Sequence, residues 1–228
     1  MFRFVRFRFD REVFRDTMLN GLSEFIGEFS MCISMAAYNF VIMRRIGVDG
    51  VTAFTVVGYT TYVFSMVVCG FGQGMAPLSS FVYGAKEKLL ARNLFTRTVL
   101  LVLAAGCATV ALVVLGSSLY SRISVDDVAV QQMIKSGILI FMWSYILCGL
   151  NAIASFYFTS IGKAKESAVI SSARGLVILL AAIFVLPAIL GMNGVWLASP
   201  ATEILTLVIT LFYLKKDRKE IDDAKQAE

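Results

Sequence analysis

The sequence predicts an all-α, polytopic membrane protein with six transmembrane helices. Of its 228 residues, 58% are hydrophobic and only 16% are charged, and the mean hydropathy is +0.76. A soluble domain of this length carries about 25% charged residues. The apolar residues gather in runs of about 20 or more, the length that a helix needs to cross a bilayer. Lipid must therefore be the solvent for much of the surface.

The apolar runs predict the spans in chain order. We expect them over residues 18–43, 51–77 with a continuation to Gly84, 99–120, 134–160, 168–190 and 195–214. The links at 47–50 and 191–194 contain glycines, which suit helix ends and tight turns. No Pro/Ser-rich linker interrupts the chain, so we predict one bundle. Its parts are a basic amphipathic N-terminus (1–17), a six-helix region (18–214) and a charged tail (215–228).

The basic residues predict the orientation. Most of them lie in residues 1–17, 84–97, 162–165 and 215–228, which alternate with links that hold few. Lys and Arg concentrate on the cytoplasmic side of a membrane. Both termini are therefore expected in the cytoplasm, and the protein is expected to be a multi-pass protein of the cell membrane.

The composition argues against catalysis and against nucleic-acid binding. The net charge is +5, but the basic residues sit in short clusters between apolar runs and form no basic face. The chain has no histidine, no CxxC pair among its four cysteines and no Gly-x-Ser-x-Gly elbow. We expect no enzyme, no metal site, no disulfide framework and no cofactor.

The first predicted helix carries carboxylates at bilayer depth, where ionisable groups are costly and mark candidate functional sites. At 100° per residue, Glu24, Glu28, Cys32 and Asn39 share one face, with Glu28 near the midplane. A proton- or cation-binding role and a structural hydrogen bond to another helix are both open for these acids. The serines of this helix lie on a different face and are expected to pack against a neighbour: Ser23, Ser30 and Ser34.

The last two predicted helices hold a second acid and a buried cation. Ser199, Glu203, Thr206 and Thr210 form a stripe at helical spacing on the last helix. Arg174 lies on the preceding antiparallel helix, so its long side chain can reach Glu203. An ion pair would lower the cost of both charges in the membrane. A purely structural pair and a role in transport are both open.

The second and fourth predicted helices add neutral polar groups. Gly70 and Gly74 form a small-xxx-small face that predicts close helix packing, and Gln73 lies between them. Pro77 has no N–H for the carbonyl of Gln73, so we predict a hinge there and another at Pro200. The fourth helix shows a polar face without an acid, where we expect interhelical contacts: Ser144, Cys148, Asn151 and Ser155.

Several of these segments resemble a known family. In the same order along the chain, they resemble segments in the C-terminal lobe of the multidrug and toxic compound extrusion (MATE) family. The segments are residues 21–28 (GLSEFIGE) followed by Asn39, residues 72–77 (GQGMAP) followed by Tyr83-Gly84-Ala85, the run Ser171–Arg174, and residues 194–203 (GVWLASPATE). The resemblance implies a six-helix lobe, two of which make one transporter. It also implies export of drugs or metabolites in exchange for H⁺ or Na⁺.

Site residues follow from the same resemblance. Glu28 resembles the acid on the first helix of that lobe, whereas Asn39, Gln73, Arg174 and Glu203 resemble its polar positions. Asn151 stands where some members have a second acid, which puts a sodium site in doubt. The chain has half the helices of a complete member, so the expected partners are the bilayer, a small-molecule substrate and a second lobe, either another copy or a separate N-terminal half. An inactive remnant and a flippase for lipid-linked sugars are the alternative functions.

Overall fold

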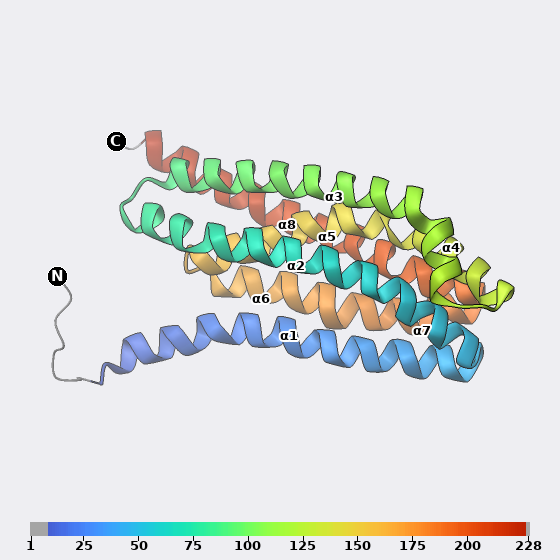
Figure 1. The fold of residues 1–228 in the computed structure, drawn as a ribbon. Helices are drawn as coiled ribbons and strands as arrows, with labels where there is room; N and C mark the ends of the chain where they lie inside the picture. Colours follow the sequence, from blue (N-terminus) through green and yellow to red (C-terminus); the bar gives the residue numbers. More distant parts are fainter. Residues whose placement is uncertain (1–8, 227–228) are drawn as a thin grey trace.

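The chain folds into an elongated helical bundle (Figure 1). The structure, a computed structural model, describes residues 9–226 and, within them, the side chains of all but residues 20, 23, 24 and 224–226. In that part of the chain all regular elements are helical. In order they are α1 (Arg11–Arg45), α2 (Val48–Gly84), α3 (Lys88–Ser124), α4 (Val128–Phe141), α5 (Trp143–Ser160), α6 (Ala164–Ser172), the π-helix η1 (Ala173–Val177), α7 (Ile178–Leu190) and α8 (Met192–Gln226).

The predicted six spans are confirmed when one broken helix is counted as a span. Five segments of the described chain are long and apolar enough to cross a membrane: α1 from Phe25 onward, α2, α3, the continuous α6–η1–α7 segment and α8. The sixth span, predicted as one helix over 134–160, is the pair α4 and α5, which bends by 44° at Met142. Periodicity did not predict this break, because the hydrophobic run continues through it.

The helices are longer than the apolar runs that predict them. Only residues 85–87 separate α2 from α3, so the basic link predicted over 84–97 is mostly the first turns of α3. Likewise α8 continues through the charged tail to Gln226. Hydrophobicity shows where a helix meets lipid, but a helix extends into water as long as its backbone hydrogen bonds persist.

Glycines lie in the turns between helices, and aspartates cap the first turns of two helices. Gly47, Gly162 and Gly191 have φ of 98°, 78° and 57°, left-handed values that cost a residue with a Cβ. Asp10 accepts hydrogen bonds from the N–H groups of Glu12 and Val13 at 2.9 and 3.2 Å. Asp127 caps α4 in the same way. These turns allow successive helices to run antiparallel.

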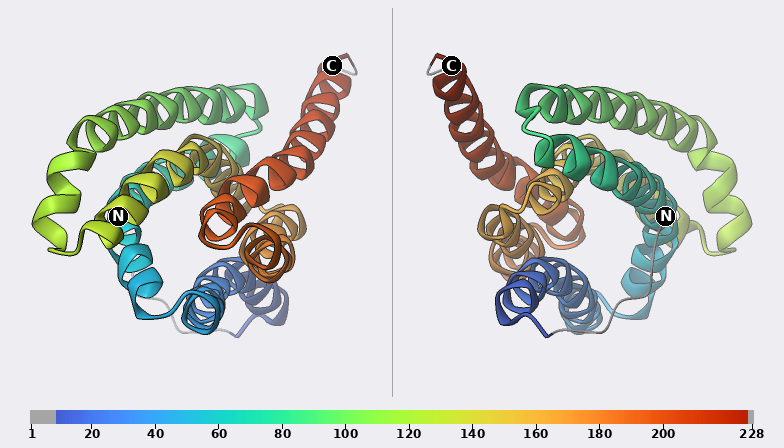
Figure 2. Two further views of the ribbon diagram at one scale, coloured as in Figure 1. Left: turned by 90° about the vertical axis from the view of Figure 1, so that its right-hand side faces the viewer. Right: turned by 90° about the vertical axis from the view of Figure 1, so that its left-hand side faces the viewer.

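The arrangement places α1 and α3 on opposite sides of the bundle, with α5 between them (Figure 2). α1 begins and α8 ends at the same end of the bundle, as an even number of crossings requires (Figure 1). The large aromatic side chains Tyr145, Tyr157, Phe64, Phe158 and Trp196 are fully buried. The outer face of α3 is apolar and exposed, as a lipid-facing helix should be: Leu101, Leu112, Leu115, Leu119 and Ile123.

Candidate functional site

A buried polar network joins α5, η1 and α8 at the centre of the bundle. Nε of Arg174 lies 2.8 Å from Oε1 of Glu203, and the Glu203 side chain is almost fully buried. The Asn151 amide donates to Oε2 of Glu203 at 2.8 Å and to its backbone carbonyl at 3.0 Å. Thr210 in turn donates to Oδ1 of Asn151 at 2.8 Å. The carboxylate therefore has a countercharge and a second donor, which buried charges require.

The predicted pair of Arg174 and Glu203 is thus confirmed, as is the expectation that the polar face of the fourth span makes interhelical contacts. Cys148 on that face accepts a hydrogen bond from Nη2 of Arg174 at 2.8 Å, and Ser155 bonds Ser167 of α6 at 2.8 Å. Sequence reasoning missed that Asn151 binds Glu203 directly. The available signal for this contact was that each of the two helices carries a stripe of polar residues spaced three or four positions apart.

Arg174 projects from an irregular turn that the sequence did not predict. It lies in η1, where the helix takes five residues to each hydrogen-bonded turn instead of four. The next residue is Gly175, and a Cβ added there would lie 2.5 Å from Cβ of Ser30 on α1. Ser34 donates to the Gly175 carbonyl at 2.6 Å. The expected packing role of Ser30 and Ser34 is confirmed: they attach α1 to this irregular turn.

The acidic face of α1 does not join the network. Glu28 is exposed and forms no ion pair with any residue that the structure describes. Cys32 and Met35 beside it are exposed as well. Asn39 is half-buried and donates to the carbonyl of Met35 in its own helix at 3.0 Å. The predicted Glu24 belongs to α1, but its side chain lies outside the described residues.

The Gln73 region is a groove between α2 and α5. Gln73 and Pro77 are exposed and line a cavity of about 460 Å³ together with Ala76, Ser80, Phe156, Thr159 and Ser160. The expected packing face of Gly70 and Gly74 is wrong, because an added Cβ at either would meet nothing within 4 Å. The close contact is at Gly72, where a Cβ would lie 2.3 Å from the Phe156 ring.

The remaining predicted residues lie on α8. Ser199 is half-buried one turn before Glu203 and makes no hydrogen bond to the network of described residues. Thr206 is buried. α8 continues through Pro200, and α2 through Pro77, so both prolines are helical; whether they act as hinges stays a prediction.

A second ionic cluster, which the sequence did not reveal, lies at the end of the bundle where α1 begins and α8 ends. Asp217 of α8 is only 2% exposed and contacts Nη1 of Arg92 at 3.2 Å, Nζ of Lys163 at 2.8 Å and the Tyr157 hydroxyl at 3.1 Å. Burial opposes the charge on Lys163, but its hydrogen bonds to Asp217 and Glu220 outweigh this and raise its pKa. The cluster ties three helices and a loop together.

Among the described residues no group of three or more His, Cys, Asp or Glu side chains is placed to hold a metal ion. Arg174 and Glu203 compensate each other's charge, whereas Glu28, within a membrane span, has no ion-pair partner among the residues whose side chains are described. Ionisable groups at membrane depth are costly and mark candidate functional sites.

The family model described as MatE matches residues 25–189, which is most of the chain. A comparison with curated proteins gives no match.

Solved structures with the same fold agree. The outward-facing conformation of a multidrug resistance MATE family transporter of the MOP superfamily has a TM-score of 0.87 and 19% identity, over 98% of this chain and 50% of that one. MATE in complex with MaL6 has a TM-score of 0.85 and 19% identity, over 96% and 49%. A MOP superfamily transporter from Pyrococcus furiosus, for which reverse polarity of the binding pocket suggests a different function, has a TM-score of 0.83 and 19% identity, over 96% and 49%. The chain spans about half the length of these structures.

Proposed function

Since this chain belongs to the MatE family, we propose that it forms one six-helix lobe of an efflux antiporter. The antiporter exports small cationic, amphipathic drugs or metabolites across the cell membrane in exchange for H⁺ or Na⁺. The observation that carries the proposal is the exposed carboxylate of Glu28, which sits within a membrane span on a face of α1. A charge on a lipid-facing surface is costly, so this face requires water or a partner.

The two acids of the membrane region have different roles in this proposal. Glu203 is paired with Arg174 and bonded to Asn151, so a change in its protonation would leave Arg174 without its countercharge. We therefore assign Glu203 to holding α5, η1 and α8 together. Glu28 has no such partner among the described residues, so a change in its charge breaks no ion pair of the bundle there.

A second six-helix lobe would cover the Glu28 face. The chain matches half the length of solved transporters, and in such transporters parallel repeats are related by an axis along the membrane normal. Both a second copy of this chain and a separately encoded lobe would insert with the required orientation. Exposed methionines beside Glu28, namely Met31 and Met35, would give the cleft an adaptable apolar wall for varied substrates.

The proton is the ion that the contacts favour. A sodium site needs several free oxygen atoms, and Asn151, the polar residue of the fourth span, already uses its Oδ1 to accept from Thr210. Its amide nitrogen is committed to Glu203. Proton coupling needs only a carboxylate that reaches water, which suits Glu28. In this scheme both termini lie in the cytoplasm, a proposal that the positions of the basic clusters support.

The test is ethidium export driven by a pH gradient, measured in proteoliposomes that contain this chain alone and in membranes where it is expressed with its neighbouring genes. Export by the chain alone supports a dimer of copies, whereas export only in the second preparation supports a separate lobe. In whichever preparation is active, Glu28→Gln should abolish the gradient-dependent export and leave membrane insertion unchanged.

Glu12→Gln is the matched control, because Glu12 is an exposed acid on the same helix before the apolar span begins. It should export at the parent rate. Undiminished export by the Glu28→Gln protein would remove this residue from the mechanism. No gradient-driven export from either preparation would instead favour an inactive remnant.

A further inference from the structure

One arginine of α3 lies on the surface that faces lipid. Arg97 is exposed, and so are Leu100 and Leu101, which follow it on the same helix. Residues 98–121 contain no charged side chain. As a helix they extend about 36 Å, slightly more than the hydrocarbon core of a bilayer. Arg97 therefore lies where that core begins, at the depth of the lipid headgroups.

The charge of Arg97 is not balanced within the lobe. Arg92, five residues earlier on α3, donates to Asp217 and to the Leu214 carbonyl, each at 3.2 Å. Arg97 forms no ion pair or hydrogen bond with any residue that the structure describes, and residues 90–104 of its own helix include no acid. A guanidinium stays charged at any physiological pH, and a charge beside hydrocarbon is costly, so its countercharge has to come from outside the lobe.

The neighbours of Arg97 on its face of α3 match the parts of a phospholipid. At 100° per residue, Asn93, Arg97 and Leu101 lie within an arc of about 80°. Asn93 is exposed one turn toward the start of the helix, on the headgroup side, whereas Leu101 is exposed one turn toward the middle of the bilayer. The planar guanidinium can donate two parallel hydrogen bonds to one phosphate, and the Asn93 amide can add a third. The leucines would lie against the acyl chains.

The end of the bundle where α3 begins is electropositive. Arg92 of α3 and Lys163 of the α5–α6 link both pair with Asp217 of α8. Three segments therefore meet at this end, residues 84–97, 161–166 and 214–226, and each has a net positive charge. Basic residues near a membrane surface attract anionic lipids, so this end favours an anionic headgroup over a zwitterionic one.

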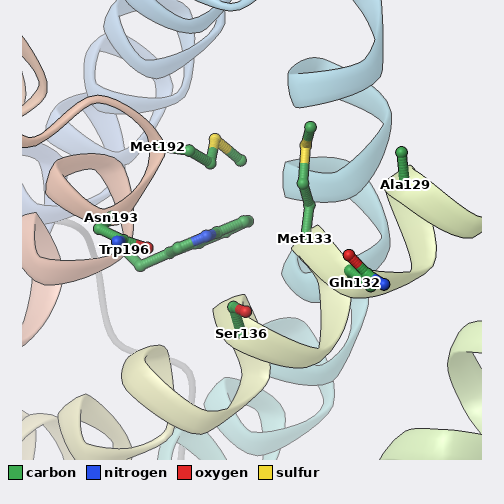
Figure 3. Close-up of a pocket in the computed structure, with 7 residues that line it drawn as sticks. All are labelled: Ala129, Gln132, Met133, Ser136, Met192, Asn193 and Trp196. Atoms are coloured by element: carbon green, nitrogen blue, oxygen red, sulfur yellow. The ribbon is translucent and has the colours of Figure 1, made fainter.

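The opposite end of the bundle offers no comparable field. Residues 44–50, 122–127 and 191–194 join the helices there and together carry no net charge. The pocket at that end, of about 270 Å³ between the first turns of α4 and α8, is lined by uncharged groups such as Gln132 and Asn193 (Figure 3). Arg122, the exposed arginine at that end of α3, lies close in sequence to Asp126 and Asp127, which disfavour an anion.

We propose that Arg97 and Asn93 bind the phosphate of an anionic phospholipid on the outer face of α3. This helix lies on the opposite side of the bundle from α1 (Figure 2). A second lobe that covers the Glu28 face would therefore leave the outer face of α3 to lipid. The site requires neither Glu28 nor a second lobe, so the proposal is independent of ion-coupled export.

Native mass spectrometry of the chain in detergent, with equal amounts of phosphatidylglycerol and phosphatidylcholine, tests the proposal. The parent protein should retain phosphatidylglycerol in excess over phosphatidylcholine. Arg97→Gln should raise the apparent dissociation constant for phosphatidylglycerol at least about fivefold, the effect of one cation near an anionic surface. Asn93→Leu should raise it less. Both side chains are exposed, so both variants should keep the melting temperature of the parent in lipid-free detergent.

Arg122→Gln is the matched control, because it removes an exposed arginine from the other end of the same helix. It should bind phosphatidylglycerol like the parent, and soluble glycerol phosphate at the same concentration should not displace the lipid. Unchanged binding by Arg97→Gln, or equal retention of both lipids by the parent, would overturn the proposal. Equal losses in the two arginine variants would overturn the location, and displacement by glycerol phosphate would overturn the assignment to a lipid.

Discussion

Oε1 of Glu203 lies 2.8 Å from Nε of Arg174, and the other oxygen of the same carboxylate accepts a hydrogen bond from Asn151 at 2.8 Å. The three residues come from η1, α5 and α8, so one buried carboxylate connects three segments of the bundle. The same network leaves Glu28 of α1 as an acid without a countercharge among the described residues. That division underlies the roles that we propose for the two acids.

Glu203→Gln should destabilise the fold by about 3 kcal/mol, because it leaves the half-buried Arg174 without its countercharge within a membrane span. Unfolding in detergent micelles by denaturant measures the loss. The double variant Arg174→Met/Glu203→Gln should recover at least half of it, since no unpaired charge remains. A single variant as stable as the parent would show that the ion pair does not hold these helices.

Asp217→Asn should lower the free energy of unfolding by about 2 kcal/mol, since the amide cannot balance both Arg92 and Lys163. Thermal unfolding in detergent would measure it. Asp222→Asn on the same helix is the control: Asp222 is exposed and pairs with Arg218 at only 3.7 Å, so its loss should be within about 0.5 kcal/mol. Equal effects of the two variants would contradict a structural role for the Asp217 cluster.

Gly194→Ala should destabilise the protein by about 1–3 kcal/mol or prevent its folding. An added Cβ would lie 2.2 Å from the carbonyl oxygen of Leu186 and 2.6 Å from the nitrogen of Pro187, and backbone atoms cannot move aside as a side chain can. Gly116→Ala, where a Cβ meets nothing within 4 Å, should be neutral. Comparing the yield and melting temperature of the two variants tests the close contact of α7 with α8.

Cys32 and Cys107 should differ in their reaction with a charged, water-soluble thiol reagent. Both are exposed in the lobe, but Cys32 lies one turn from Glu28 on the proposed cleft face, whereas Cys107 lies on the apolar α3. A thiol reacts as its thiolate, which needs water. Single-cysteine variants in membranes should show labelling at Cys32 at least about tenfold faster than at Cys107. Equal rates would contradict a hydrated cleft along α1.

The sequence alone determined the features that depend on periodicity and on the cost of charge in lipid. A run of apolar residues must become a span, so six crossings followed from hydropathy. Arg174 and Glu203 could be paired because consecutive spans run antiparallel and each charge at depth needs a partner. The packing face of Ser30 and Ser34 followed from the 100° rotation between residues.

The tertiary structure decided which faces meet. Helical periodicity placed Gly70 and Gly74 on one face but could not show that Gly72 is the residue that meets Phe156. In the sequence, Asp217 lies in a charged tail, which predicts a solvated side chain. In the structure it is buried, and it pairs with Arg92 and Lys163, which are distant in sequence. The break at Met142 and the π-helix at Arg174 likewise leave no mark on the periodicity of the sequence. Such contacts depend on the relative rotation and depth of whole helices, which no single helix encodes.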